Sequence, residues 1–168
     1  MKKLYTYIFI LILFSSFSYA DKNMKIGSEG SLEEVSRTIK VKMFDNHYEP
    51  NSFSIKAGET IKFEVENAGM LVHEFNIANK MMHINHQPEM LKMAANGILL
   101  AFSIDKEKMK KMALTDKSMG HSHSNSLLLE PKQKGEIIWK FINATDIEIA
   151  CNVPGHYQAG MIAKVNIN

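Results

Sequence analysis

The stretch CNVPGHYQAGM, from Cys151 to Met161, contains the only cysteine of the chain, with a histidine and a methionine further on. Strand-like sequence flanks it on both sides, so its ends are expected to lie close together. Pro154-Gly155 predicts a tight turn just before His156. A thiolate, an imidazole and a thioether then come from one loop, and this soft ligand set suits copper that cycles between two oxidation states. Zinc ranks second, because its sites use Cys, His and carboxylate ligands without a thioether.

A second histidine is needed to complete a site of one Cys, two His and one axial Met. His73, in NAGMLVHEFNI, opens a predicted strand after a glycine-containing turn, where its ring can point toward the Cys151 loop. Taken singly, His73 would be an ordinary half-buried histidine and Met161 a core residue, since methionine fills gaps well. The Cys151 loop favours ligation for both. The predicted metal ligands are His73, Cys151, His156 and Met161.

The first 20 residues, MKKLYTYIFILILFSSFSYA, are typical of an export signal, with two lysines, an apolar run and a small-x-small cleavage pattern that ends at Ala20. The apolar run is too short to span a bilayer, and no later segment has the roughly 20 apolar residues that a membrane helix needs. We therefore expect a periplasmic mature chain from Asp21 on, without a membrane span. Its single cysteine can form no internal disulfide, so metal ligation gives the thiol of Cys151 a use.

The charge of the mature chain limits its partners. The whole chain has a formal charge of +2, and the signal carries two lysines and no acids, so the mature charge is zero. A neutral chain offers no electrostatic basis for binding nucleic acid or anionic membranes. The 148 residues that remain (168 minus 20) are enough for one domain with a proper core.

Short runs rich in Val, Ile and Phe, separated by turn residues, dominate the chain from Thr38 on. In TIKFEVE, apolar and charged residues alternate, as in a half-buried antiparallel strand. Many short strands at such spacing predict an all-β sandwich or barrel. Residues 21–37 are polar and without period, and we expect a flexible leader there. The predicted strands cover residues 38–44, 52–56, 60–66, 73–77, 126–130, 135–141, 146–151 and 161–167.

The strand pattern is interrupted at about residues 81–125. Pro88 fits the first position of a helix and Asn96-Gly97 supplies its end, and a second short helix is predicted at about 106–114. The following SMGHSHSNS has no core-forming residues and predicts a mobile, solvated loop. We therefore expect a partly helical insertion.

The interruption is also rich in methionine and histidine. One interpretation is that the methionines of the helices pack over one end of the sandwich while the histidines of HSHS are solvated. The other is weak, exchangeable binding of copper(I) by thioethers and of copper(II) by His121-Ser122-His123. The residues concerned are Met81, Met82, Met90, Met93, Met109, Met112, Met119, His83, His86, His121 and His123.

The spacing C-x4-H-x4-M, the upstream His73 and the run HYEPNSFSIKAGETIKFEVENAG before it resemble the cupredoxins, the type 1 (blue) copper family of plastocyanin, azurin and rusticyanin. The resemblance covers about residues 38–168 apart from 81–125. The Cys-to-His spacing is similar to that of rusticyanin-like members, and the methionine-rich segment resembles that of periplasmic copper-resistance cupredoxins. The resemblance implies a Greek-key β-sandwich with one type 1 copper per chain.

Two functions remain open at this point. The first is an exported blue copper protein that carries single electrons to or from a redox partner, such as a cytochrome, oxidase or reductase, through the edge of His156, and is not an enzyme. Backbone N–H groups of Glu74 and Val153 are expected near the sulfur. The alternative is a periplasmic protein for copper resistance, sequestration or delivery, with a copper donor or acceptor as partner. A multicopper oxidase or nitrite reductase would need further histidine pairs, and only His121-x-His123 is present.

Overall fold

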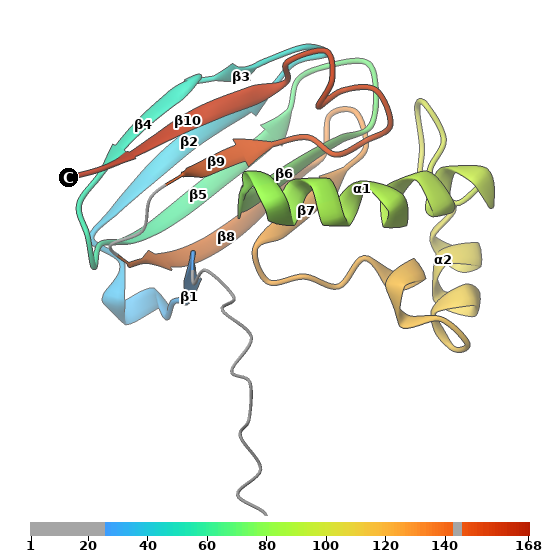
Figure 1. Cartoon of the computed structure of the whole chain (residues 1–168), viewed down its shortest axis with the longest axis horizontal. Coiled ribbons are helices and arrows are strands. Elements are labelled where there is room, and N and C mark those ends of the chain that lie inside the picture. The colour runs from blue at the N-terminus through green and yellow to red at the C-terminus, as the bar shows by residue number, and fades with distance from the viewer. Residues whose placement is uncertain (1–25, 143–145) are drawn as a thin grey trace, which may run out of the picture.

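The computed structural model describes residues 26–142 and 146–168, and the predicted signal, residues 1–20, lies outside these. Two sheets pack face to face, with helices beside one of them (Figure 1). Their strand orders are β1-β8-β5-β2-β3 and β4-β10-β9-β6-β7, with parallel pairs β2-β5 and β4-β10. The elements are β1 (Gly27–Glu29), η1 (Leu32–Glu34), β2 (Arg37–Met43), β3 (Tyr48–Glu49), β4 (Ser52–Ile55), β5 (Thr60–Asn67), β6 (His73–Asn79), α1 (Lys80–Ala95), α2 (Lys106–Ala113), η2 (Lys117–Gly120), β7 (Ser126–Leu129), β8 (Lys134–Phe141), β9 (Ile147–Ala150) and β10 (Ile162–Ile167).

The predicted β-sandwich is confirmed, since each predicted strand corresponds to one of β2 and β4 to β10. The short strands β1 and β3 were not predicted. β1 lies within residues 21–37, the segment predicted to be a flexible leader. It pairs antiparallel with β8, and Ile26 just before it is buried in the core. A strand of three residues is too short to show a period of two in the sequence, so β1 could not be predicted. Residues 27–29 of the predicted flexible leader therefore belong to a sheet.

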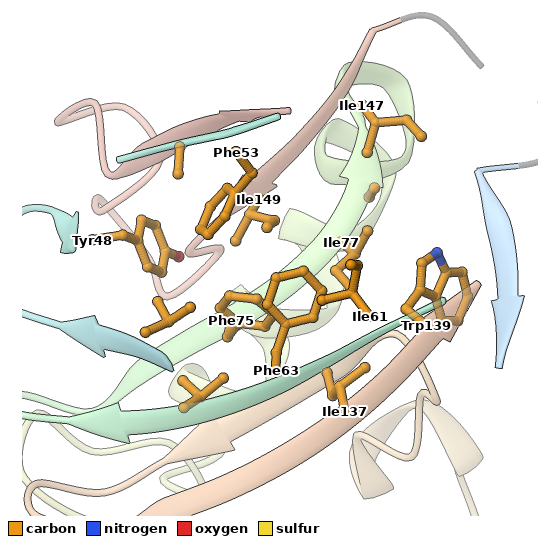
Figure 2. Close-up of a cluster of buried hydrophobic side chains, with 14 of the residues drawn as sticks. Tyr48, Phe53, Ile61, Phe63, Phe75, Ile77, Ile137, Trp139, Ile147 and Ile149 are labelled. Carbon is orange, nitrogen blue, oxygen red and sulfur yellow. The ribbon is translucent and has the colours of Figure 1, made fainter. Parts of the chain in front are cut away.

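The core between the two sheets is centred on aromatic side chains (Figure 2). Phe63 of β5 is fully buried, and its ring centroid lies 5.2 Å from that of Phe75 and 5.8 Å from that of Phe53. Tyr48 is also buried, and its hydroxyl donates a hydrogen bond of 2.7 Å to the carbonyl oxygen of Glu74. This contact ties the aromatic core to the strand that begins with His73.

The insertion follows β6 and differs from the prediction at its start. Helix α1 begins at Lys80, and Pro88 lies inside it instead of at its first turn. The side chain of Asn79 accepts the N–H of Met82 at 2.9 Å and caps the helix there, so the helix starts well before the proline. The predicted end at Asn96-Gly97 and the second helix, α2, are confirmed.

A second, smaller core joins the insertion to the sandwich. Several of its methionines are fully buried, so packing explains Met90, Met93 and Met119, whereas Met81 is exposed. The expectation of a solvated SMGHSHSNS loop is wrong for Met119 and for the side chain of His121, because both pack under the helices. The insertion therefore buries the outer side of β6, and every residue of that strand is buried. Within the described ranges, no helix is long and apolar enough to cross a membrane.

Candidate metal centre

The loop from Cys151 to Met161 closes at its two ends, as its flanking strands predict. The backbone N–H of Cys151 donates to the carbonyl oxygen of Met161 at 3.2 Å, and the N–H of Met161 donates to that of His156 at 3.0 Å. The turn at Gly155, with a φ of 91°, lets the N–H of His156 reach the carbonyl oxygen of Val153 at 2.9 Å. A glycine adopts this positive φ without steric cost. The turn therefore sets His156 back toward Cys151.

Three of the four predicted ligands converge. Cys151 Sγ lies 3.4 Å from His156 Nδ1 and 3.9 Å from His73 Nδ1, and the three donor atoms all lie within 4.8 Å of one another. Cys151 and His73 are fully buried, while His156 is partly exposed. Two imidazole nitrogens and a thiol sulfur around one point match the donor set of a copper site.

Met161 is the fourth predicted ligand. It is fully buried in the same core as Cys151, and its backbone hydrogen bonds to Cys151 and His156 place it at the base of the loop. This position is consistent with an axial role. Ligation by its thioether stays a prediction.

A metal that binds at the sulfur of Cys151 must replace a tightly held proton. Complete burial raises the pKa of Cys151 to about 12, and the backbone N–H groups of Glu74 and Val153 offset this only in part. The N–H of Glu74 lies 3.3 Å from the sulfur, as expected from the sequence. Without a metal, the side chain is therefore a neutral thiol at neutral pH. Metal binding must release its proton.

Both candidate histidine ligands are held as neutral rings. Burial lowers the pKa of His73 and of His156 below the ordinary value, and the hydrogen bond that His73 donates to Asp45 opposes this only partly at His73. Asp45 Oδ1 lies 3.0 Å from His73 Nε2, which leaves Nδ1 to face the sulfur. The same oxygen accepts the N–H groups of Met70 and Leu71. Asp45 thus orients the ring and fixes the turn before it.

We expect Asp45→Asn to lower the affinity for copper by about 10- to 100-fold, because partners on the far nitrogen of a ligand histidine set its orientation and basicity. Competition with a chelator of known affinity measures the change. Asp105→Asn is the matched control, because Asp105 also accepts a backbone N–H but caps α2. Equal affinities of the two variants would show that Asp45 has no part in metal binding.

Of the four histidines in the insertion, three lie together. The ring centroids of His86, His121 and His123 are 5.2–5.3 Å from one another. His83 is fully buried on α1, with its Nδ1 3.1 Å from the side-chain nitrogen of Asn152. The sequence alone gave no sign that residues of α1 and of the HSHS segment would meet, because their contact depends on how the insertion folds over β6.

The two-sheet fold and the Cys-His-His cluster define the class of protein to which the chain belongs. Residues 6–90 match the family described as Cupredoxin-like domain, and the chain belongs to this family. It is 39% identical over 147 residues to the Copper-resistant cuproprotein CopI of Pseudomonas aeruginosa, covering 84% of this chain and 81% of that protein. It is 28% identical over 146 residues to the CopI of Rubrivivax gelatinosus, covering 86% and 74%.

Solved structures of other proteins have the same fold as this chain. Auracyanin B superimposes with a TM-score of 0.58 at 16% identity, over 84% of this chain and 96% of its own. The dithionite-reduced auracyanin of Roseiflexus castenholzii gives a TM-score of 0.56 at 16% identity, over 80% and 98%. At this identity the likeness concerns the architecture alone. The predicted cupredoxin fold is therefore confirmed.

Proposed function

We propose that the protein binds one copper ion through His73, Cys151, His156 and Met161 and serves copper resistance in the periplasm. The observation that carries the proposal is the convergence of the two Nδ1 atoms on the buried sulfur of Cys151. The name of the relative in Pseudomonas aeruginosa, a copper-resistant cuproprotein, supports the resistance role. On this proposal the protein is a metal-binding protein and not an enzyme.

Copper held there would supply one-electron chemistry between its two oxidation states. The residues of the chain provide the surroundings. The buried position of Cys151 keeps water and oxidants from the thiol, and the N–H of Glu74 stabilises negative charge on its sulfur. Asp45 holds the ring of His73 in place. The ligands are thus fixed before any metal arrives.

Copper tolerance of a sensitive bacterium tests the proposal. We expect the exported native chain to raise the copper concentration at which the cells still grow, and His73→Asn to remove most of this protection because a ligand of the buried site is lost. His47→Asn is the matched control, since His47 is exposed and stacks on Phe44. Protein levels are compared by immunoblot. Equal protection by the native chain and by His73→Asn, at equal levels, would refute the resistance role of the site.

A second candidate function is electron transfer to a redox partner. It is favoured by the partial exposure of His156, which borders a hollow of about 210 Å³ lined by apolar residues such as Leu71, Leu100 and Pro154. An apolar surface over a ligand histidine suits docking of another protein. Copper exchange discriminates the functions: an electron carrier retains its copper through redox cycles, whereas a delivery protein gives it up to an acceptor.

A further inference from the structure

A buried carboxylate lies directly behind the proposed copper site. Glu74 follows His73 on β6, and its side chain is fully buried on the opposite side of the strand, under the insertion. Helix α1 lies beside the end of the sheet that holds β6 (Figure 1) and brings His86 to this carboxylate. His121, just after η2, reaches it from the other side of the insertion.

One oxygen of this carboxylate has more polar neighbours than lone pairs. A carboxylate oxygen has about two lone pairs available. Four polar atoms lie within hydrogen-bonding distance of Glu74 Oε1, and two of them are imidazole nitrogens that can also bind a metal. These atoms are Ser126 Oγ at 2.7 Å, His121 Nε2 at 2.8 Å, His86 Nε2 at 3.0 Å and Asn76 Nδ2 at 3.1 Å.

The charge of this group also needs a partner. A carboxylate without exposure to solvent is costly unless a positive group or several hydrogen bonds compensate it. Its second oxygen accepts the backbone and side-chain N–H groups of Asn152 at 3.0 and 2.7 Å. Among the described residues, the hydrogen-bond partners of Glu74 include no lysine or arginine. These hydrogen bonds compensate part of the charge, and among the described partners of Glu74 a positive charge can come from the histidines or from a bound cation.

A second carboxylate lies beside the other nitrogen of the His86 ring. Glu89 Oε2 lies 3.5 Å from Nδ1 of His86, on the far side of the ring from Glu74. A proton on Nδ1 facing Glu89 leaves the lone pair of Nε2 free for a metal, as in carboxylate–histidine–metal arrangements. The other oxygen of Glu89 lies 3.1 Å from Nε2 of His123, whose side chain is 38% exposed. The group formed by His86, Glu89 and His123 therefore lies between solvent and the buried group of Glu74, His86 and His121.

We propose that Glu74, His86 and His121 form a second metal site, for a divalent cation of the late first-row transition series. Imidazole nitrogen suits copper and zinc, and Cu²⁺ binds most tightly in this series. The donor atoms of the three residues lie within 4.8 Å of one another. In a tetrahedral site with bonds of about 2.0–2.1 Å the donors lie about 3.3 Å apart, so distances of 2.8 and 3.0 Å need only a small expansion.

The site is separate from the one at Cys151 and stands whether or not copper binds there. The two are nonetheless linked through one residue, because the backbone N–H of Glu74 donates to Cys151 Sγ. A cation on the carboxylate of Glu74 therefore lies one residue from the proposed copper thiolate. Filling the second site is expected to shift the visible absorption of the first.

Metal stoichiometry tests the second site. Equilibrium dialysis against Cu²⁺ should show a second equivalent in the native chain, with no additional thiolate absorption band. His86→Asn and His121→Asn should each lose this second equivalent and keep the first with its band. His47→Asn is the matched control and should keep both. Cys151→Ser should lose the first and keep the second. One equivalent in the native chain, or a second equivalent that survives in both insertion variants, would overturn the proposal.

A measurement on the native chain covers the case in which a variant does not fold, because replacing a histidine leaves the buried carboxylate with fewer partners. Crystals soaked in Cu²⁺, and others in Zn²⁺, are examined by anomalous diffraction at the respective absorption edges. We expect a peak between Glu74 Oε1, His86 Nε2 and His121 Nε2. Absence of a peak there with both metals, at concentrations that fill the Cys151 site with Cu²⁺, would refute the second site and leave the first proposal intact.

Discussion

The copper(II)-loaded protein is expected to absorb strongly in the visible, with a blue or green colour, and Cys151→Ser is expected to abolish the band. The physical reason is the thiolate. A sulfur held between the Nδ1 atoms of His73 and His156, at 3.9 and 3.4 Å, can form a short bond to copper that gives intense charge transfer. An oxygen in its place gives no such transition. An absorption spectrum of each loaded protein is the measurement.

Met161→Leu serves as the control for this spectrum. Leucine fills a similar buried volume but cannot donate a lone pair, so the band should persist while the reduction potential rises, because removing a weak donor disfavours copper(II). An unchanged potential would point to another axial group. A colourless copper(II) complex of the native chain would refute the type 1 assignment altogether.

The second large effect concerns stability. We expect Phe63→Ala to lower the free energy of unfolding of the metal-free protein by about 3–5 kcal/mol, the range for removing a large aromatic side chain from a packed core. Phe63 is fully buried, and its ring lies within 6.2 Å of those of Phe53, Phe75 and Phe141, measured between centroids. Urea unfolding followed by the fluorescence of Trp139, the single tryptophan, measures the change.

Phe102→Ala is the matched control, because the side chain of Phe102 is exposed, with a relative accessibility of 67%. Its replacement should change the free energy of unfolding by no more than about 0.5 kcal/mol, as is usual for surface positions. Similar losses in the two variants would mean that the aromatic cluster between the sheets does not dominate the stability of the fold.

The sandwich could be predicted from the sequence because period-two alternation is a local signal. In β5, the pattern that begins at Ile61 places Phe63 and Val65 on the core side, as the structure has them. The start of α1 could not be predicted in the same way. Pro88 is the stronger local signal, but the cap at Asn79 and the burial of His83 on the first turns extend the helix toward the N-terminus.

The convergence of the candidate ligands was predictable to the extent that they share one loop. Cys151 and His156 are five positions apart, and Pro154-Gly155 between them predicts the turn. Asp45 could not be found, because it lies 28 positions from the ring of His73 that it orients, in a loop between other strands. The carboxylate of Glu74 was missed for the same reason. Such contacts arise only when the strands have paired.

The enclosure of β6 on both sides has a consequence for the lifetime of a bound ion. A strand that is buried at every position opens only when much of the domain opens, so His73 is not free to swing away and release a metal. Pro154 and Gly155, in contrast, are exposed, and the loop that contains them carries His156. If copper binds at the Cys151 site as proposed, we expect fluctuations of this loop to set its residence time, and an acceptor that removes the ion to approach from there.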